Sequence, residues 1–239
     1  MKPYFLFLAL ILVACSTSEE QNSEPQTKTV KEIQSDDLQV ALLIMDGTYN
    51  TELTAPMDIF HHTNFRDSIQ AMAVFTIAES MDDVITFEGL KISPDFDFSN
   101  HPEIDILVIP AAEGHLGADL QNEKLIQFIK DVEPNADYVM SHCDGAFLLA
   151  KTGLLDDRKS TTFPGDIEEY QEMYPNLDVA EEVLFVHDGK YITSAGGAKS
   201  FEASLYLCEL LYGKKVADQL AKGMVIDWDL NSIDYIKVD

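Results

Sequence analysis

The chain has 239 residues, of which 46% are hydrophobic and 10% are aromatic, enough for one globular domain with a substantial core. Its 42 acidic residues outnumber its 16 basic residues, and the formal net charge is −26 at pH 7. Proteins bind nucleic acids through clusters of lysine and arginine, and the sequence contains no such cluster. The composition therefore argues against a nucleic-acid partner.

The cysteine content argues against a disulfide framework and against a structural zinc site. The three cysteines, Cys15, Cys143 and Cys208, lie in different contexts, and no two have the spacing of metal ligands. Cys208 falls on the apolar stripe of a predicted helix, which favours a place in the core. The adjacent pair His61-His62 does not lie on one helix face, so we expect no metal. No motif predicts a cofactor.

The first 14 residues predict a lipoprotein signal peptide. Ten apolar residues, 5–14, follow a single positive charge, and a membrane-spanning helix would need about 20. The run ends in Leu12-Val13-Ala14-Cys15, which resembles a bacterial lipobox, where Cys15 becomes the lipidated N-terminus. The alternative is an ordinary secretory signal with an incidental cysteine. We expect a lipid anchor in a bacterial cell envelope, in the outer membrane, facing the periplasm or the surface.

Residues 15–37 predict a flexible acidic linker after that cysteine. They are rich in Ser, Thr, Glu, Gln and Lys and contain almost no apolar side chains, so they cannot pack a core. A random coil of this length spans roughly 25 Å.

Residues 38–239 predict one domain in which strands alternate with helices. Short apolar runs indicate strands at 38–45, 71–79, 104–110 and 136–142, edge-type strands at 182–187 and 191–194, and a hairpin at 84–92. Helical periodicity indicates helices at 52–63, 120–132, 146–150, 201–212 and 216–222, with Pro56 near the first turn of the first helix. This alternation predicts an α/β fold, a doubly wound and mostly parallel sheet with helices on both faces.

The segment 138–149 carries the main functional signal. An apolar strand ends at Cys143, and Asp144, Gly145 and Ala146 lead directly into a helical pattern. A sharp strand–turn–helix of this kind is typical of a nucleophile elbow, and small residues at 145 and 146 allow tight packing. We expect the start of the helix to favour a reactive thiolate at Cys143. The alternative is that Cys143 is a small buried hydrophobic residue.

In open α/β sheets, ligands bind beyond the carboxyl ends of the strands. Three such ends carry polar or flexible segments, 46–52, 110–115 and 143–144. If these strands are neighbours, Glu52, a loop of backbone amides and the Cys143 thiol come together.

Several motifs, in order, resemble the ThiJ/PfpI superfamily. They are the segments 51–60, 141–156, 159–162 and 193–196, and the likeness extends over about residues 38–228. The resemblance implies the flavodoxin-like fold of the class I glutamine-amidotransferase group. Within the superfamily, the isonitrile-hydratase-like branch, which also supplies domains of AraC-type regulators, is the most similar.

The resemblance implies roles for individual residues. Cys143 corresponds to the elbow nucleophile and Glu52 to the acid that exchanges a proton with it. The backbone amides that could hold an oxyanion or substrate are those of Ala112, Gly114, Gly145 and Ala195. It also implies a homodimer and a small-molecule substrate or ligand.

This chain departs from the family pattern at three places. Asp144 stands where active relatives usually have His or Thr, and a carboxylate there disfavours the thiolate. Asp144 could serve as a proton carrier or could cap the following helix. The segment Pro110-Ala111-Ala112 replaces Pro-Gly-Gly, and Phe163-Pro164 replaces His-Trp.

Three hypotheses remain open from the sequence. The first is a hydratase- or hydrolase-type enzyme in which Cys143 attacks a small electrophile such as an isonitrile, aldehyde or amide. The second is a non-catalytic lipoprotein that binds a small molecule or a partner on the same fold. The third is an oxidation sensor in which Cys143 forms a sulfinic acid held by Glu52.

Overall fold

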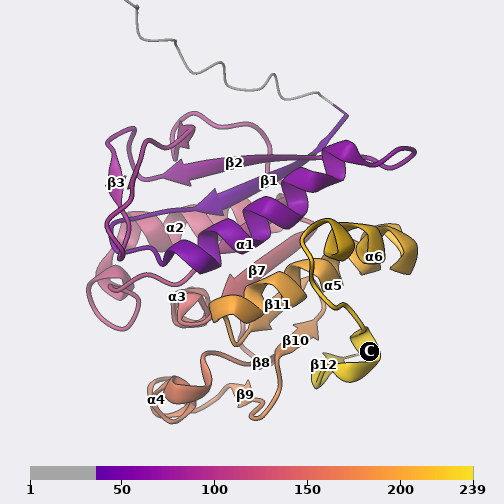
Figure 1. The fold of residues 1–239 in the computed structure, drawn as a ribbon. Coiled ribbons are helices and arrows are strands. Elements are labelled where there is room, and N and C mark those ends of the chain that lie inside the picture. The colour runs from indigo at the N-terminus through magenta and orange to yellow at the C-terminus, as the bar shows by residue number, and fades with distance from the viewer. Residues whose placement is uncertain (1–35, 239) are drawn as a thin grey trace, which may run out of the picture. The chain divides into compact units, whose positions relative to one another are not determined.

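The computed structural model describes residues 36–238, which form an α/β fold around one eight-stranded sheet (Figure 1). The strand order across the sheet is β12-β10-β11-β7-β6-β1-β2-β5. The strands are β1 (Leu38–Leu43), β2 (Met72–Ala78), β5 (Phe96–Asp97), β6 (Ile106–Ile109), β7 (Tyr138–His142), β10 (Phe185–Asp188), β11 (Tyr191–Ser194) and β12 (Tyr235–Val238). All neighbouring pairs are parallel except β10 and β11.

Helices cover both faces of the sheet. The helices α1 (Asn50–His61), α5 (Ser200–Tyr212) and α6 (Lys214–Gly223) pack on one face, where α1 and α5 lie side by side (Figure 1). The helices α2 (Glu123–Val132), α3 (Gly145–Lys151) and α4 (Ile167–Met173) contribute to the core on the other face. The predicted doubly wound, mostly parallel fold is confirmed.

Side chains alternate between the two cores along each central strand, as strand geometry requires. In β1, Val40 and Leu42 belong to the core under α1 and α5, whereas Ala41 and Leu43 belong to the core under α2 and α3. Because both faces are buried, the strand is almost entirely apolar, with Gln39 as the exception, which is the pattern that the sequence showed.

Two details differ from the sequence-based prediction. The strands β10 and β11 are interior rather than edge strands, because β11 lies between β10 and β7 and β12 pairs in parallel with β10. Helix α1 begins at Asn50, so Pro56 lies inside the helix rather than near its first turn. The predicted hairpin at 84–92 is present as β3 (Val84–Ile85) and β4 (Lys91–Ile92), and a further short pair joins β8 (Lys159–Ser160) to β9 (Asp178–Val179).

The predicted signal peptide, Cys15 and most of the predicted linker lie outside the described residues. Across residues 36–238, no helix has the length and apolar character that a membrane crossing requires.

Candidate functional site

The carboxyl ends of β1, β6 and β7 lie at one edge of the sheet because these three strands are parallel neighbours. Cys143 follows β7 directly and has a φ of 51°, in the left-handed region that residues with a side chain rarely adopt. Its amide donates to the carbonyl of Ser194 at 2.9 Å, and its carbonyl accepts from Oγ1 of Thr162 at 3.0 Å. These bonds hold the strained turn in place, which is the expected geometry of an elbow.

Two glycines allow the backbone to close tightly around Cys143. A Cβ at Gly145 would collide with the carbonyl oxygen of Ile109, so only glycine lets α3 start this close to β6. Gly196 has a φ of 74°, and a Cβ there would collide with Cys143 itself. The turn after β11 therefore packs directly on the elbow.

Glu52 meets the thiol from helix α1. Its Oε2 accepts from the Ala111 amide at 3.0 Å and its Oε1 accepts from the Gly197 amide at 2.8 Å. The side chain is only 5% exposed, and the Cys143 thiol hydrogen-bonds to the carboxylate. The structure thus brings together the two residues that the sequence paired as nucleophile and proton partner.

Electrostatics at this site keep Cys143 protonated. Burial raises the pKa of the Cys143 thiol far above its usual range, and the nearby charges of Glu52 and Asp144 raise it further. The Asp144 amide, which points at Sγ, favours the thiolate but does not outweigh those effects. The helix start does favour the thiolate, as expected, but burial beside two acids raises the pKa of the thiol by more than the Asp144 amide lowers it.

Burial also raises the pKa of Glu52, although the amides of Gly197 and Ala111 and the Cys143 thiol oppose this rise. Three hydrogen bonds to one carboxylate favour its charged form. Glu52 is therefore placed to receive a proton from the neighbouring thiol.

Asp144 does not cap the helix that follows it. It occupies the N-cap position of α3, yet its side chain accepts no hydrogen bond from the first turn. Its carboxyl contacts the Cys143 thiol and the carboxyl of Asp166, and burial, followed by Asp166, raises the pKa of Asp144 to about 7. Of the two roles left open for this residue, the structure excludes the cap.

Two of the four predicted oxyanion-binding amides, those of Ala112 and Ala195, are engaged in local hydrogen bonds. The Ala112 amide donates to Nδ1 of His115 at 3.2 Å, and the Ala195 amide donates to the carbonyl of Leu184 at 2.9 Å. The Gly114 carbonyl accepts from the amides of Gly117 and Asp119 within its own loop. These local bonds occupy the Ala112 and Ala195 amides. The Asp144 amide, by contrast, donates toward the Cys143 sulfur.

Two buried histidines lie next to this site, and burial lowers the pKa of each to about 3. His142 lies on the face of β7 shared with Met140, as alternation predicts, and its Nδ1 lies 2.8 Å from Oγ of Ser194. His115 is fully buried, and its Nε2 lies 3.3 Å from Sδ of Met45.

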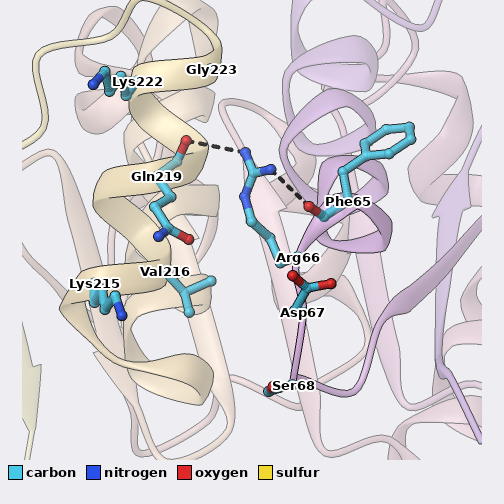
Figure 2. Close-up of a pocket in the computed structure, with 9 residues that line it drawn as sticks. All are labelled: Phe65, Arg66, Asp67, Ser68, Lys215, Val216, Gln219, Lys222 and Gly223. Carbon is cyan, nitrogen blue, oxygen red and sulfur yellow. Dashed lines mark hydrogen bonds between the residues drawn. The ribbon is translucent and has the colours of Figure 1, made fainter.

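The opposite end of the sheet holds an open hollow of about 810 Å³ between the segment after α1 and helix α6 (Figure 2). Arg66 crosses it and donates to the carbonyls of Phe65 and Gln219, both at 3.1 Å. Its guanidinium therefore joins the segment after α1 to helix α6.

Within residues 36–238, no group of three or more His, Cys, Asp or Glu side chains is arranged to hold a metal ion.

Comparison with known proteins matches the family model described as "DJ-1/PfpI family" over residues 38–210, most of the chain. The chain belongs to the DJ-1/PfpI family. Its curated relatives include an isonitrile hydratase from Pseudomonas putida, 26% identical over 75% of each chain. They also include the HTH-type transcriptional regulator CdhR from Pseudomonas aeruginosa, 32% identical over 60% of this chain and 42% of the regulator.

Solved structures of the DJ-1/PfpI family share the fold. A ThiJ/PfpI family protein from Pseudomonas syringae superimposes with a TM-score of 0.68 at 23% identity, covering 88% of this chain and 84% of that one. Drosophila melanogaster DJ-1beta superimposes with a TM-score of 0.69 at 20% identity, covering 80% of this chain and all of that one. At this identity the likeness establishes the fold, and the chemistry has to be argued from the site.

Proposed function

We propose that this protein is a cysteine-dependent hydratase- or hydrolase-type enzyme that acts on a small uncharged electrophile. The observation that carries the proposal is the contact between the Cys143 thiol and the Glu52 carboxylate, at an elbow held in a strained conformation. Nucleophile, base and a base-orienting pair of amides are the three parts that such a site requires. The relative that is an isonitrile hydratase supports this class of substrate.

In the proposed reaction, Cys143 attacks as a thiol rather than as a preformed thiolate. Its raised pKa requires that the proton leave as the sulfur–carbon bond forms, and Glu52 is the acceptor already in contact. Ala111 and Gly197 hold the Glu52 carboxylate in place for this transfer. Water then adds its hydroxyl to the same carbon and its proton to the substrate atom that gained negative charge, the carbon–sulfur bond breaks, and the sulfur regains its proton from Glu52. With an amide, Glu52 first gives its proton to the departing nitrogen as the carbon–nitrogen bond breaks, and later takes a proton from the attacking water.

The charges around the thiol restrict the substrate. Glu52 acts on Cys143 as a negative neighbour, so a carboxylate or phosphate next to the reacting carbon would be repelled. An isonitrile, an aldehyde or a simple amide lacks that charge. We expect a neutral electrophile to react and its carboxylate-bearing analogue to react much more slowly.

A panel of uncharged isonitriles, aldehydes and amides tests this function directly. Wild-type protein should convert at least one of them, and Cys143→Ala should lose that turnover. The matched control is Cys208→Ala, which removes the other described thiol and should leave turnover unchanged. Turnover that survives Cys143→Ala would overturn the mechanism.

A ligand-binding role is the second candidate, and the match to a transcriptional regulator favours it. In this role the ligand would bind at the same site around Cys143 without a covalent step. In that case Cys143→Ala would change the affinity for a small ligand, measured by calorimetry, while the wild-type protein would turn over none of the panel.

The lipid anchor and the homodimer are separate proposals. The lipobox-like segment ending at Cys15 supports an envelope lipoprotein. Metabolic labelling with a radioactive fatty acid in a bacterial host should mark the wild type and not Cys15→Ser.

For the dimer, light scattering of residues 36–239 should give twice the chain mass, and a monomer mass would contradict the proposed dimer.

A further inference from the structure

Three basic side chains of this acidic protein gather at the hollow between the segment after α1 and helix α6 (Figure 2). Arg66, Lys215 and Lys222 line it, and Asp67 is the one acidic residue among the described residues that do so. Lys215 and Lys222 are seven positions apart on α6, which places them on one face of the helix. The hollow therefore carries a local positive charge on a chain whose formal net charge is −26.

The three cations of the hollow have no carboxylate partner within residues 36–238. None of them forms an ion pair there, whereas the adjacent Lys214 pairs with Asp218 at 2.7 Å. The hydrogen bonds of the Arg66 guanidinium go to two backbone carbonyls, and Lys215 and Lys222 are exposed. Their charge is therefore available to an anion from outside the domain.

An exposed aromatic ring lies beside these cations. Phe65 lines the same hollow and is 66% exposed. Figure 2 shows its ring pointing away from helix α6 and from Arg66. Aromatic rings next to lysine and arginine are typical of protein surfaces that lie on a membrane, where the ring enters the headgroup boundary and the cations contact lipid phosphates.

The hollow also lies where the chain enters the domain. Nε2 of Gln70 donates to the carbonyl of Asp36, the first described residue, at 2.9 Å. The segment that forms one wall of the hollow therefore continues into the contact that holds the start of the domain. Twenty residues, 16–35, separate Asp36 from the predicted lipid attachment at Cys15. A predicted linker of this length, roughly 25 Å as a random coil, favours this face as the one nearest an anchoring membrane.

We propose that this face is a docking surface for an anionic phospholipid membrane, on which Arg66, Lys215 and Lys222 contact headgroup phosphates and Phe65 enters the interface. Each basic residue near such a membrane raises the ratio of docked to free protein about fivefold. The negative charge elsewhere on the domain does not prevent the contact, because salt screens it beyond about 8–10 Å. Docking would turn the Cys143 site, at the opposite end of the sheet, away from the membrane.

The test holds the protein on vesicles by an artificial tether, so it does not depend on lipidation of Cys15. The compact unit spans Ile33–Asp239, and a chain of residues 16–239 keeps it whole. This chain carries an N-terminal His tag that binds a nickel-chelating lipid, and Phe65→Trp reports contact with the membrane. Brominated lipids should quench this tryptophan in vesicles that contain phosphatidylglycerol and much less in vesicles of phosphatidylcholine alone. The parent chain with Phe65 corrects for the buried Trp228.

Two pairs of charge variants locate the contact. Lys215→Gln with Lys222→Gln should lower the ratio of docked to free protein by about tenfold or more, because two cations leave the docking surface. Lys130→Gln with Lys151→Gln is the matched control, since it removes two exposed lysines from α2 and α3, on the other face of the sheet. The control pair should leave quenching unchanged. All four lysines are exposed, so we expect the fold to tolerate each substitution.

Quenching that is absent, that is equal without phosphatidylglycerol, or that falls equally in both pairs of variants would overturn the docking surface. Two other occupants would also overturn it. Quenching that appears only after deletion of residues 16–32 would show that this acidic segment fills the hollow. Inorganic phosphate that binds the hollow by calorimetry, in a protein that no vesicle quenches, would assign it to a free anion. None of these readouts uses turnover at Cys143, so loss of the proposed enzyme function would leave the test unaffected.

Discussion

Cys143 and Cys208 are both buried thiols whose pKa burial raises, yet they lie in contrasting surroundings. Cys208 lies on helix α5 within an apolar core, and burial alone explains the shift of its pKa. Cys143 lies at a strained elbow, where two acids contact its sulfur and two hydrogen bonds fix its backbone. Burial of a cysteine therefore does not distinguish a core residue from a candidate nucleophile, whereas backbone strain and polar contacts at the sulfur do.

The largest expected effect separates the two cysteines through serine substitution. Cys143→Ser should lower activity by about 1,000-fold or more and leave stability nearly unchanged, because a hydroxyl can still donate to Glu52. Cys208→Ser should leave activity unchanged and cost about 1–3 kcal/mol of unfolding free energy, because it buries an unpaired hydroxyl. Enzyme kinetics and denaturant unfolding of both variants measure these opposite effects on activity and stability. Equal losses of activity, or equal losses of stability, in the two variants would contradict the prediction.

The next largest loss of activity is expected for Glu52→Gln. Glutamine keeps the side-chain volume but cannot accept the thiol proton, so activity should fall by about 100- to 10,000-fold. Glu123→Gln at the exposed start of α2 is the control, since it removes one negative charge from a helix that carries no residue of the site. A loss below about tenfold would show that Glu52 does not take the proton.

Gly196→Ala should disturb the elbow through the backbone alone. The methyl group would collide with Cys143 at a backbone angle that favours glycine, at a cost of roughly 1–3 kcal/mol in unfolding free energy. Gly197→Ala is the matched control, because its φ is also positive but a Cβ there meets no atom within 4 Å. Chemical denaturation should therefore show Gly196→Ala as the less stable of the two variants.

The smallest effect concerns the pH dependence of stability. The pKa of Asp144 is raised to about 7, so the native state keeps a proton that the unfolded chain releases near pH 4. This group therefore lowers stability progressively as pH rises from about 4 to 7. Asp144→Asn should raise Tm by about 2–4 °C at pH 8, after allowance for solvent screening, and by less at pH 4. An equal change at both pH values would contradict the shift.

Much of the fold follows from the sequence, because its signals are local. The central strands are mostly apolar, and the small residues Gly145 and Ala146 mark the turn from strand to helix after Cys143. Strand β12 was missed because Tyr235–Val238 is short and partly exposed, so it carries no core pattern. The interior position of β10 depends on that later strand and could not be inferred without it.

The site was predictable only in part. The pairing of Glu52 with Cys143 follows from parallel strands ending at one edge of the sheet. The thiol's protonation was not foreseen, because burial and the combined charge of acids from separate elements outweigh the helix start. Asp166 was missed for the same reason, since nothing local in Pro164-Gly165-Asp166 indicates a contact 22 residues away.

Covalent capture tests the central claim most directly. The protein is incubated with a reactive uncharged isonitrile, quenched, digested, and analysed by peptide mass spectrometry. An adduct should form on Cys143 in the wild type, decrease strongly in Glu52→Gln, and stay absent from Cys208 in both. Substrate turnover without any adduct on Cys143, or equal labelling of Cys143 and Cys208, would contradict the assignment of Cys143 as the nucleophile.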